Sequence, residues 1–128
     1  MEIHVLNPFV DSEKIWLWLD TDGLRRKVFR VVNQELVNAE HIAAGLTIFD
    51  PGEASSLHDH ADSEEIDFIA KGRGEVVSGS ERVEFGENSF MFIPKGVEHQ
   101  HVNTGDEPLS LIWMPRLANV RPASPGTS

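Results

Sequence analysis

The 128-residue chain contains no cysteine and no tyrosine. Without cysteine there are no disulfide bonds, so nothing in the sequence indicates an oxidising compartment, and a structural zinc site built on thiolates is excluded. Without tyrosine, no mechanism can use a tyrosine base or a tyrosyl donor. A glycine-rich phosphate loop and a nucleophile-elbow serine are also missing, so the usual signs of nucleotide binding and of hydrolase chemistry are absent.

Long apolar runs and basic residues are also scarce. No stretch is apolar for long enough to cross a membrane, and the start, MEIHVLNPFVDSE, has no basic segment typical of a signal peptide. We therefore expect a cytoplasmic protein. The chain has 11 lysines and arginines but 21 acidic residues, which gives a formal net charge of −10. Nucleic acid and anionic membrane surfaces would therefore be repelled. A small-molecule substrate is the expected partner.

Short strand-like runs fill most of the sequence. They are separated by turn signals about every eight to twelve residues, a pattern typical of an all-β sandwich or barrel, and no stretch has a convincing helical period. The length suits one domain with one core. We expect N-terminal strands in 1–35, a barrel in 36–116 and a flexible tail, rich in proline, serine and glycine, in 117–128.

The N-terminal region is predicted to form a hairpin. Two strand-like runs, 14–19 and 25–32, flank a turn at Asp20-Thr21-Asp22-Gly23. Trp16 and Trp18 share one face of the first run and would pack on the barrel or on a second subunit. We favour a homodimer over a monomer.

Two histidine-containing stretches stand out from this background. His58 and His60 are two positions apart, so in an extended segment both imidazoles point to the same face. The turn-like residues 61–63 can reverse the chain, and Glu65 then opens a new strand, 65–70. His99 follows a turn at Pro94-Lys95-Gly96. We expect the two stretches to meet at one metal ion.

Three imidazoles and one carboxylate suit one divalent transition metal, which could be Fe, Mn, Ni, Cu, Co or Zn. These metals commonly take more than four ligands, so a set of four leaves positions open for water or substrate, the layout of a catalytic site.

The spacing of these residues resembles the two motifs of the cupin family. The first motif is matched by Gly52, His58, His60, Glu65 and Gly72 at every interval. The later members of the second motif are matched by Pro94, Gly96, His99 and Asn103. Its leading glycine is replaced by Asn88, and asparagine is the residue that next best tolerates a positive φ.

The resemblance is to small, single-domain cupins of the Cupin_2 type. It implies a jelly-roll barrel (a double-stranded β-helix) that binds a metal through His58, His60, Glu65 and His99. Many cupins of this kind are dioxygenases, whereas some cupin lyases of similar size use a tyrosine that this chain lacks.

The choice of carboxylate ligand is left open between Glu65 and Glu64. Glu65 fits the motif through to Gly72, but Glu64 shares a strand face with Ile66 and Phe68, which the apolar pattern would assign to the core.

Two further residues could carry chemistry. His101 shares the face of His99 and could act as an acid or base, or be a hydrogen-bonded structural residue. Asp67 shares the face of Glu65 and could orient a ligand, act as a base, or lie at the barrel mouth in water. Trp113 and Phe92 are expected in the core.

These residues lead to a functional expectation. We predict a metal-dependent enzyme whose substrate chelates the ion through two oxygen atoms, with Glu65, His101 or Asp67 moving the proton. A dioxygenase, and so an oxidoreductase, is favoured over an isomerase or lyase. The alternative is a non-catalytic cupin that binds a small ligand or a metal.

Overall fold

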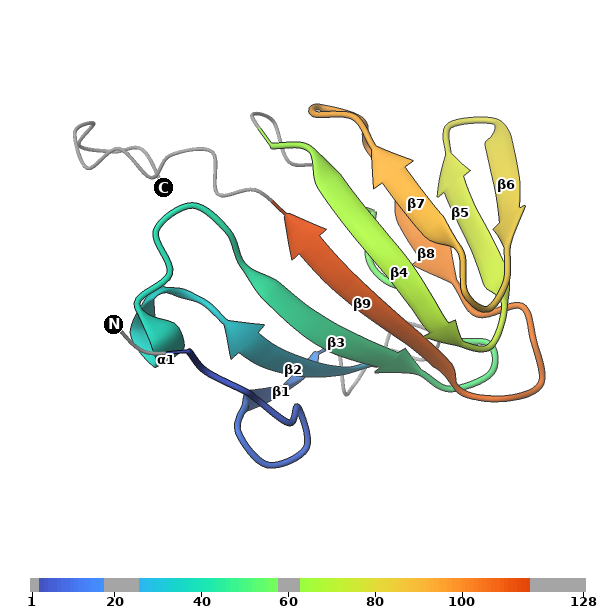
Figure 1. The fold of residues 1–128 in the computed structure, drawn as a ribbon. Coiled ribbons are helices and arrows are strands. Elements are labelled where there is room, and N and C mark those ends of the chain that lie inside the picture. Colours follow the sequence, from blue (N-terminus) through green and yellow to red (C-terminus); the bar gives the residue numbers. More distant parts are fainter. Residues whose placement is uncertain (1–2, 18–25, 58–62, 116–128) are drawn as a thin grey trace.

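The computed structural model describes residues 3–17, 26–57 and 63–115 (Figure 1). The expected turn at 20–23, the side chains of Trp16 and Trp18, the pair His58 and His60, and the expected tail at 117–128 lie outside the described residues.

Nine strands and one short helix make up the described part of the chain. In chain order they are β1 (Glu13–Leu17), β2 (Arg26–Val32), α1 (Gln34–Val37), β3 (Ala44–Phe49), β4 (Glu65–Lys71), β5 (Gly74–Ser78), β6 (Glu81–Phe85), β7 (Phe90–Ile93), β8 (Gln100–Val102) and β9 (Leu109–Pro115).

The strands form two sheets. A six-stranded sheet has the order β1-β2-β3-β9-β4-β7, and a three-stranded sheet has the order β6-β5-β8 (Figure 1). Neighbouring strands are antiparallel throughout, and β1 pairs with β2 as the predicted N-terminal hairpin requires. The all-β, double-stranded β-helix prediction is confirmed.

The short helix α1 was not predicted, because four residues are too few to show a helical period. Its ends follow local rules. The Asn33 side chain accepts a hydrogen bond from the backbone N–H of Leu36, and Asn38 ends the helix in the left-handed conformation with φ 59°. Within the described residues, no helix is both long enough and apolar enough to span a membrane.

The face of β4 that points inward is the opposite of the one its apolar pattern favoured. Glu65, Asp67 and Ile69 are buried, whereas Ile66 is 45% exposed. The fully buried core lies between the sheets, and it consists of Phe49, Ile69, Leu109 and Leu111, with Phe85, Met91 and Trp113 packed against it. The interior face of β4 therefore carries carboxyl groups at one end and core at the other.

The two motif stretches are hydrogen-bonded to each other. The backbone N–H of Gly52 donates to the carbonyl of Asn103, the N–H of Asn103 donates to the carbonyl of Glu53, and the N–H of Ser55 donates to the carbonyl of His101. The segment that leads into the first histidine pair therefore runs beside β8, as the prediction that the two stretches meet requires.

Motif residues outside the ligand set shape the backbone. Gly52, Gly72 and Gly96 have φ of 83°, 88° and 76°, and Asn88 has φ 64°, so asparagine does adopt the turn conformation expected of it. Asn103 is buried, and its side-chain amide donates to the carbonyls of Phe49 and Glu107. This residue thus holds two loops together through bonds that an apolar side chain could not make.

Candidate metal centre

Three potential metal ligands meet in the interior. Glu65 at the start of β4, His99 just before β8 and His101 within β8 each offer one ligand atom, and these atoms lie within 4.8 Å of one another. All three side chains are buried, and His99 is 0% exposed. The imidazole rings of His99 and His101 meet edge to face, with centroids 5.2 Å apart. The donor set of two imidazoles and a carboxylate fits a divalent transition metal.

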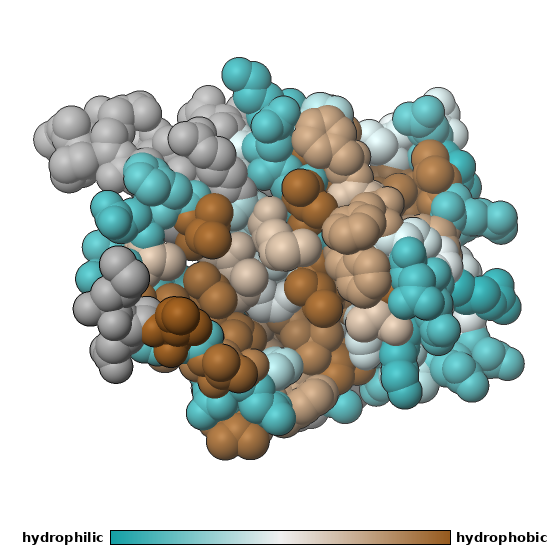
Figure 2. Space-filling view, in the orientation of Figure 1, coloured by the Kyte–Doolittle hydropathy of each residue, from teal (hydrophilic) through white to brown (hydrophobic). Residues whose placement is uncertain are grey.

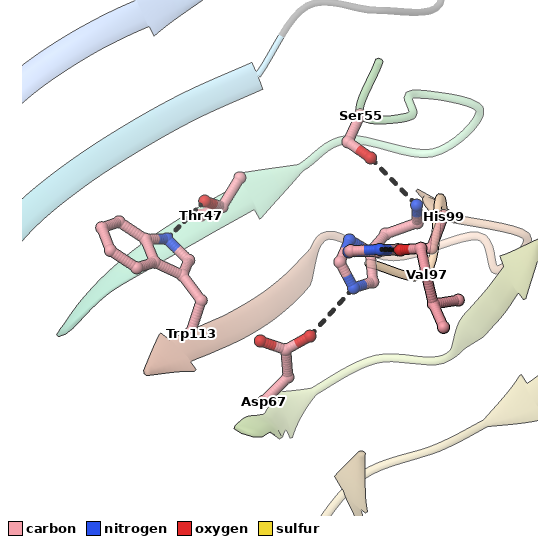
Figure 3. Close-up of polar contacts among 7 residues, drawn as sticks. Thr47, Ser55, Asp67, Val97, His99 and Trp113 are labelled. Atoms are coloured by element: carbon pink, nitrogen blue, oxygen red, sulfur yellow. Dashed lines mark hydrogen bonds and ion pairs between the residues drawn. The ribbon is translucent and has the colours of Figure 1, made fainter. Parts of the chain in front are cut away.

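A backbone contact fixes the tautomer of His99. Its Nδ1 lies 2.9 Å from the carbonyl oxygen of Val97, an acceptor, so Nδ1 carries the proton and donates it (Figure 3). The other ring nitrogen, Nε2, then carries the lone pair. Metal-ligating histidines generally have their second nitrogen held in this way, which orients the ring.

The imidazole ring of His101 is oriented by a hydrogen bond to Asp67. Its Nε2 lies 2.9 Å from Oδ2 of Asp67, and this contact connects β8 of the small sheet to β4 of the large one. The backbone N–H of His101 also donates to Oγ of Ser55 at 2.9 Å. The expectation that Asp67 could lie at the barrel mouth in water is wrong, because its side chain is 0% exposed.

Asp67 is protonated at neutral pH in the metal-free protein. Burial first, and then the hydrogen bond and the negative charge of Glu65, raise the pKa of Asp67 to about 10. A protonated Asp67 can lie beside both Glu65 and Nε2 of His101 without adding a second negative charge. The interior thus carries one negative charge here instead of two.

A cavity of about 210 Å³ opens beside this cluster. Glu65 and His101 form one side, and apolar side chains form much of the rest. Its full lining is Arg26, Val28, Arg30, Thr47, Phe49, Ser55, Glu65, His101, Leu111, Trp113 and Pro115. Nε1 of Trp113 donates to Oγ1 of Thr47 at 2.9 Å, which fixes the indole ring (Figure 3). A larger hollow of about 310 Å³ lies among loops around Gly72 and Gly105 and contains no histidine.

The structure brings together part of the predicted ligand set. Glu65 and His99 lie in one cluster, and Glu64 is exposed, so Glu65 is the carboxylate available inside. His58 and His60 are outside the described residues, and their role as ligands stays a prediction. His101 was expected to line the pocket without necessarily contacting the metal, but it offers one of the three potential ligand atoms of the cluster.

Some residues around the site were misjudged or missed. Phe92 was expected in the core but is 59% exposed, and Trp113 is a cavity wall as well as a core contact. No function was predicted for Arg26 and Arg30, the two arginines of β2. The signal that could have identified them is the alternation Arg26, Val28, Arg30, which places two cations and an apolar residue on one strand face.

The fold and the buried histidine–carboxylate cluster define a small β-helix protein with a candidate metal site. Residues 45–115, more than half of the chain, match the Cupin_2 family, described as a cupin domain. The chain therefore belongs to the cupin family.

The chain matches different fractions of the length of its relatives. It is 29% identical over 108 residues to an uncharacterized protein of Methanocaldococcus jannaschii, a match that spans 80% of each chain. It is 36% identical over 115 residues to gentisate 1,2-dioxygenase 1 of Aquipseudomonas alcaligenes, which is 89% of this chain but 30% of that enzyme.

Solved structures share the fold. A predicted oxalate decarboxylase from Thermotoga maritima superposes with a TM-score of 0.73 at 19% identity, covering 89% of this chain and 99% of the other. A Cupin 2 conserved barrel domain protein from Salinispora arenicola gives a TM-score of 0.66 at 28% identity, covering 94% and 92%.

The raised pKa of Asp67 predicts how the metal-free protein responds to pH. Because the folded-state pKa of about 10 lies above the ordinary value of 3.8, the folded chain holds this proton more tightly than the unfolded chain. The stabilising contribution is therefore complete below pH 3.8 and is lost as the pH rises toward 10. Asp67→Asn keeps an acceptor for His101 and a donor for Glu65 but cannot ionise.

We expect the free energy of unfolding of Asp67→Asn, relative to wild type, to increase steadily between about pH 5 and pH 9. Urea denaturation in the presence of a chelator measures it. Asp106→Asn, at an exposed position, is the matched control for removing a carboxylate. Parallel pH profiles for wild type and Asp67→Asn would show that Asp67 does not hold a proton at neutral pH.

Proposed function

We propose that this cupin is a metal-dependent oxidoreductase of the dioxygenase type that acts on a small, oxygen-chelating organic substrate. One observation carries the proposal: buried Glu65, His99 and His101 have ligand atoms within 4.8 Å of one another, and Glu65 and His101 line a cavity of about 210 Å³. A metal-ligand cluster that opens into a partly apolar cavity is the arrangement of a catalytic site.

The ligand set of the proposal is His58, His60, Glu65 and His99. The backbone bonds from Gly52 and Ser55 to Asn103 and His101 support it, because they run the chain toward the first histidine pair alongside β8. One divalent ion of iron, manganese, nickel, copper, cobalt or zinc would occupy the site. Such an ion supplies Lewis acidity, and iron or copper also supplies redox chemistry with dioxygen.

The remaining residues bind and orient the substrate and handle its proton. His101 lines the cavity and is held by Asp67 from behind, so it is placed to exchange a proton with a hydroxyl group of a bound substrate. Phe49, Leu111 and Trp113 give the cavity apolar walls that exclude water around the reacting group.

Dioxygenase chemistry is favoured over isomerase or lyase chemistry by a sequence relationship. The chain aligns over 89% of its length with a gentisate 1,2-dioxygenase at 36% identity, although the match spans 30% of that enzyme. The alternative is a non-catalytic cupin that binds a metal or a small ligand at the same cluster.

Metal loading and oxygen uptake test the proposal together. Wild type reconstituted with iron(II) under anaerobic conditions is expected to hold about one equivalent and to consume dioxygen with at least one member of a panel of small diketones, enediols and hydroxy acids. Glu65→Gln and His99→Gln each remove a ligand, so a loss of tenfold or more in metal affinity is expected. His41→Gln, at an exposed position away from the cluster, is the control.

Two results would count against the proposal in different ways. A protein that stays empty after reconstitution with every candidate metal would remove the metal site. A protein that binds one equivalent through Glu65 and His99, but turns over no substrate with any metal, would make the non-catalytic binding cupin the better account.

We also propose that the chain forms a homodimer through the outer face of the six-stranded sheet. We use "outer face" for the outward-pointing side chains of the three strands β4, β7 and β9, which are Ile66, Phe68, Phe90, Phe92, Ser110, Ile112 and Met114. Figure 2 views this side of the molecule and shows apolar side chains gathered over β9, β4 and β7. Phe90 is 73% exposed and lies against Phe68, with ring centroids 5.0 Å apart.

Charge does not oppose a second copy of the chain as the occupant of the outer face. The protein has a net charge of −10, so two copies repel each other over most orientations, yet the outer face as defined contains no acidic residue. An exposed apolar patch rimmed by charge is typical of an interaction surface, and a two-fold axis would pair this patch with itself.

Phe90→Glu is expected to convert a dimer into a monomer, because a carboxylate would be placed on each side of the apolar contact. Sedimentation equilibrium at micromolar concentration measures the change. Val83→Glu, at a position 51% exposed on β6 of the other sheet, should leave the mass unchanged. A monomeric wild type, or a Phe90→Glu variant that stays dimeric, would refute this interface.

A further inference from the structure

Two arginines point from β2 into the cavity beside the metal cluster. Arg26, Val28 and Arg30 alternate along the strand, so they share its inner face, and all three line the cavity. Neither the proposed ligands nor the proton-handling residues include them. Within a chain that has 11 basic and 21 acidic residues, two arginines at one cavity are an unexpected concentration of positive charge.

The arginines and the metal cluster line different parts of this cavity. Arg30, Gly45, Trp113 and Asp67 lie in one row across the sheet, so three inter-strand spacings, about 14 Å, separate the backbones of β2 and β4 there. Arg26 is four residues further along β2, and its side chain leaves the same inner face of the sheet. A small molecule in the cavity can therefore lie between the arginines and the residues Glu65 and His101, which line it as well.

A flat apolar wall connects the two ends. Gly45 pairs with both Arg30 and Trp113 across the sheet. A Cβ atom at Gly45 would collide with the indole of Trp113, so that ring occupies the space over the glycine. Phe49 and Leu111 continue the apolar lining. The middle of the cavity therefore fits an apolar body between two polar ends.

The two arginines differ in how far they are exposed to solvent. Arg30 forms an exposed pair with Glu13 of β1, with Nη1 and Oε1 3.5 Å apart. Arg26 is partly buried, and desolvation lowers its pKa from the ordinary value, although a guanidinium stays charged at any physiological pH. A partly desolvated guanidinium gains more from an anionic ligand than an exposed one does.

We propose that Arg26, assisted by Arg30, binds the carboxylate of a small organic acid whose apolar body lies against Trp113. The planar fork of a guanidinium matches a carboxylate through two parallel hydrogen bonds. This inference rests on the proposed function in that it takes the cavity as the substrate pocket. It narrows the substrate class to acids that carry, besides the carboxylate, the oxygen atoms that face the metal cluster.

Isothermal titration of the full-length chain tests the subsite with a pair of probes, phenylacetate and its neutral isostere phenylacetamide. The metal-free protein is used first, so that the carboxylate has no metal to bind. We expect phenylacetate to bind at least tenfold more tightly than phenylacetamide. Arg26→Gln should abolish this preference, and Arg26→Lys should retain part of it, because the charge is kept and the fork is lost.

Lys27→Gln is the matched control, since it removes a cation from the opposite face of the same strand. Three outcomes would each overturn the proposal. Wild type could bind the acid and the amide with equal affinity, or could fail to bind phenylacetate at roughly 10 mM. The preference for the acid could also survive in a folded Arg26→Gln variant. The titrations of the metal-free protein also separate this proposal from the proposed function, because a failure of metal binding would leave the arginine-dependent preference intact.

Discussion

The burial of two carboxyl groups side by side on β4 is the constraint on which the rest of the interior depends. Glu65 and Asp67 are both inside, and two adjacent carboxylates in a poorly solvated interior repel each other and lose hydration. The structure offsets that cost by keeping Asp67 protonated and by placing His101 against it. What remains is a single carboxylate, Glu65, beside the imidazoles of His99 and His101.

This arrangement connects stability to function. A divalent cation at the cluster would neutralise the charge that the metal-free interior holds at a cost, so metal binding and folding stability should favour each other. The loops are arranged to keep the cluster in place: Asn103 ties neighbouring turns together, and Ser55 anchors the backbone of His101. The apolar side chains of the cavity wall and the arginines of β2 then determine which small molecules can approach the cluster.

The intervals between residues of the two motifs made the fold and part of the site predictable from the sequence. Two motifs with fixed intervals require specific turns, and Asn88 occupies the turn that glycine usually fills, with φ 64°. The facing of β4 was harder to predict, because Ile66 and Phe68 are apolar yet point outward, where the outer face gathers them with Phe90. An apolar outer face and a polar inner face reverse the usual pattern of a half-buried strand.

Contacts between distant strands explain what the sequence did not reveal. The bond from His101 to Asp67 joins residues on different sheets, and nothing in the local sequence of either strand specifies it. Arg26 and Arg30 gain their place at the cavity through the register of β2 with β3 and of β3 with β9. The exposure of Phe92 likewise follows from its pairing with Ile66 of β4, which places both side chains on the outer face.

The most direct test of the central claim is a crystal structure of the metal-loaded protein with anomalous diffraction recorded at the absorption edge of the metal. We expect one anomalous peak within bonding distance of His58, His60, Glu65 and His99, roughly 2.0–2.2 Å, while His101 stays hydrogen-bonded to Asp67. A peak ligated by Glu65, His99 and His101 without the first histidine pair, or no peak inside the β-helix, would contradict the account.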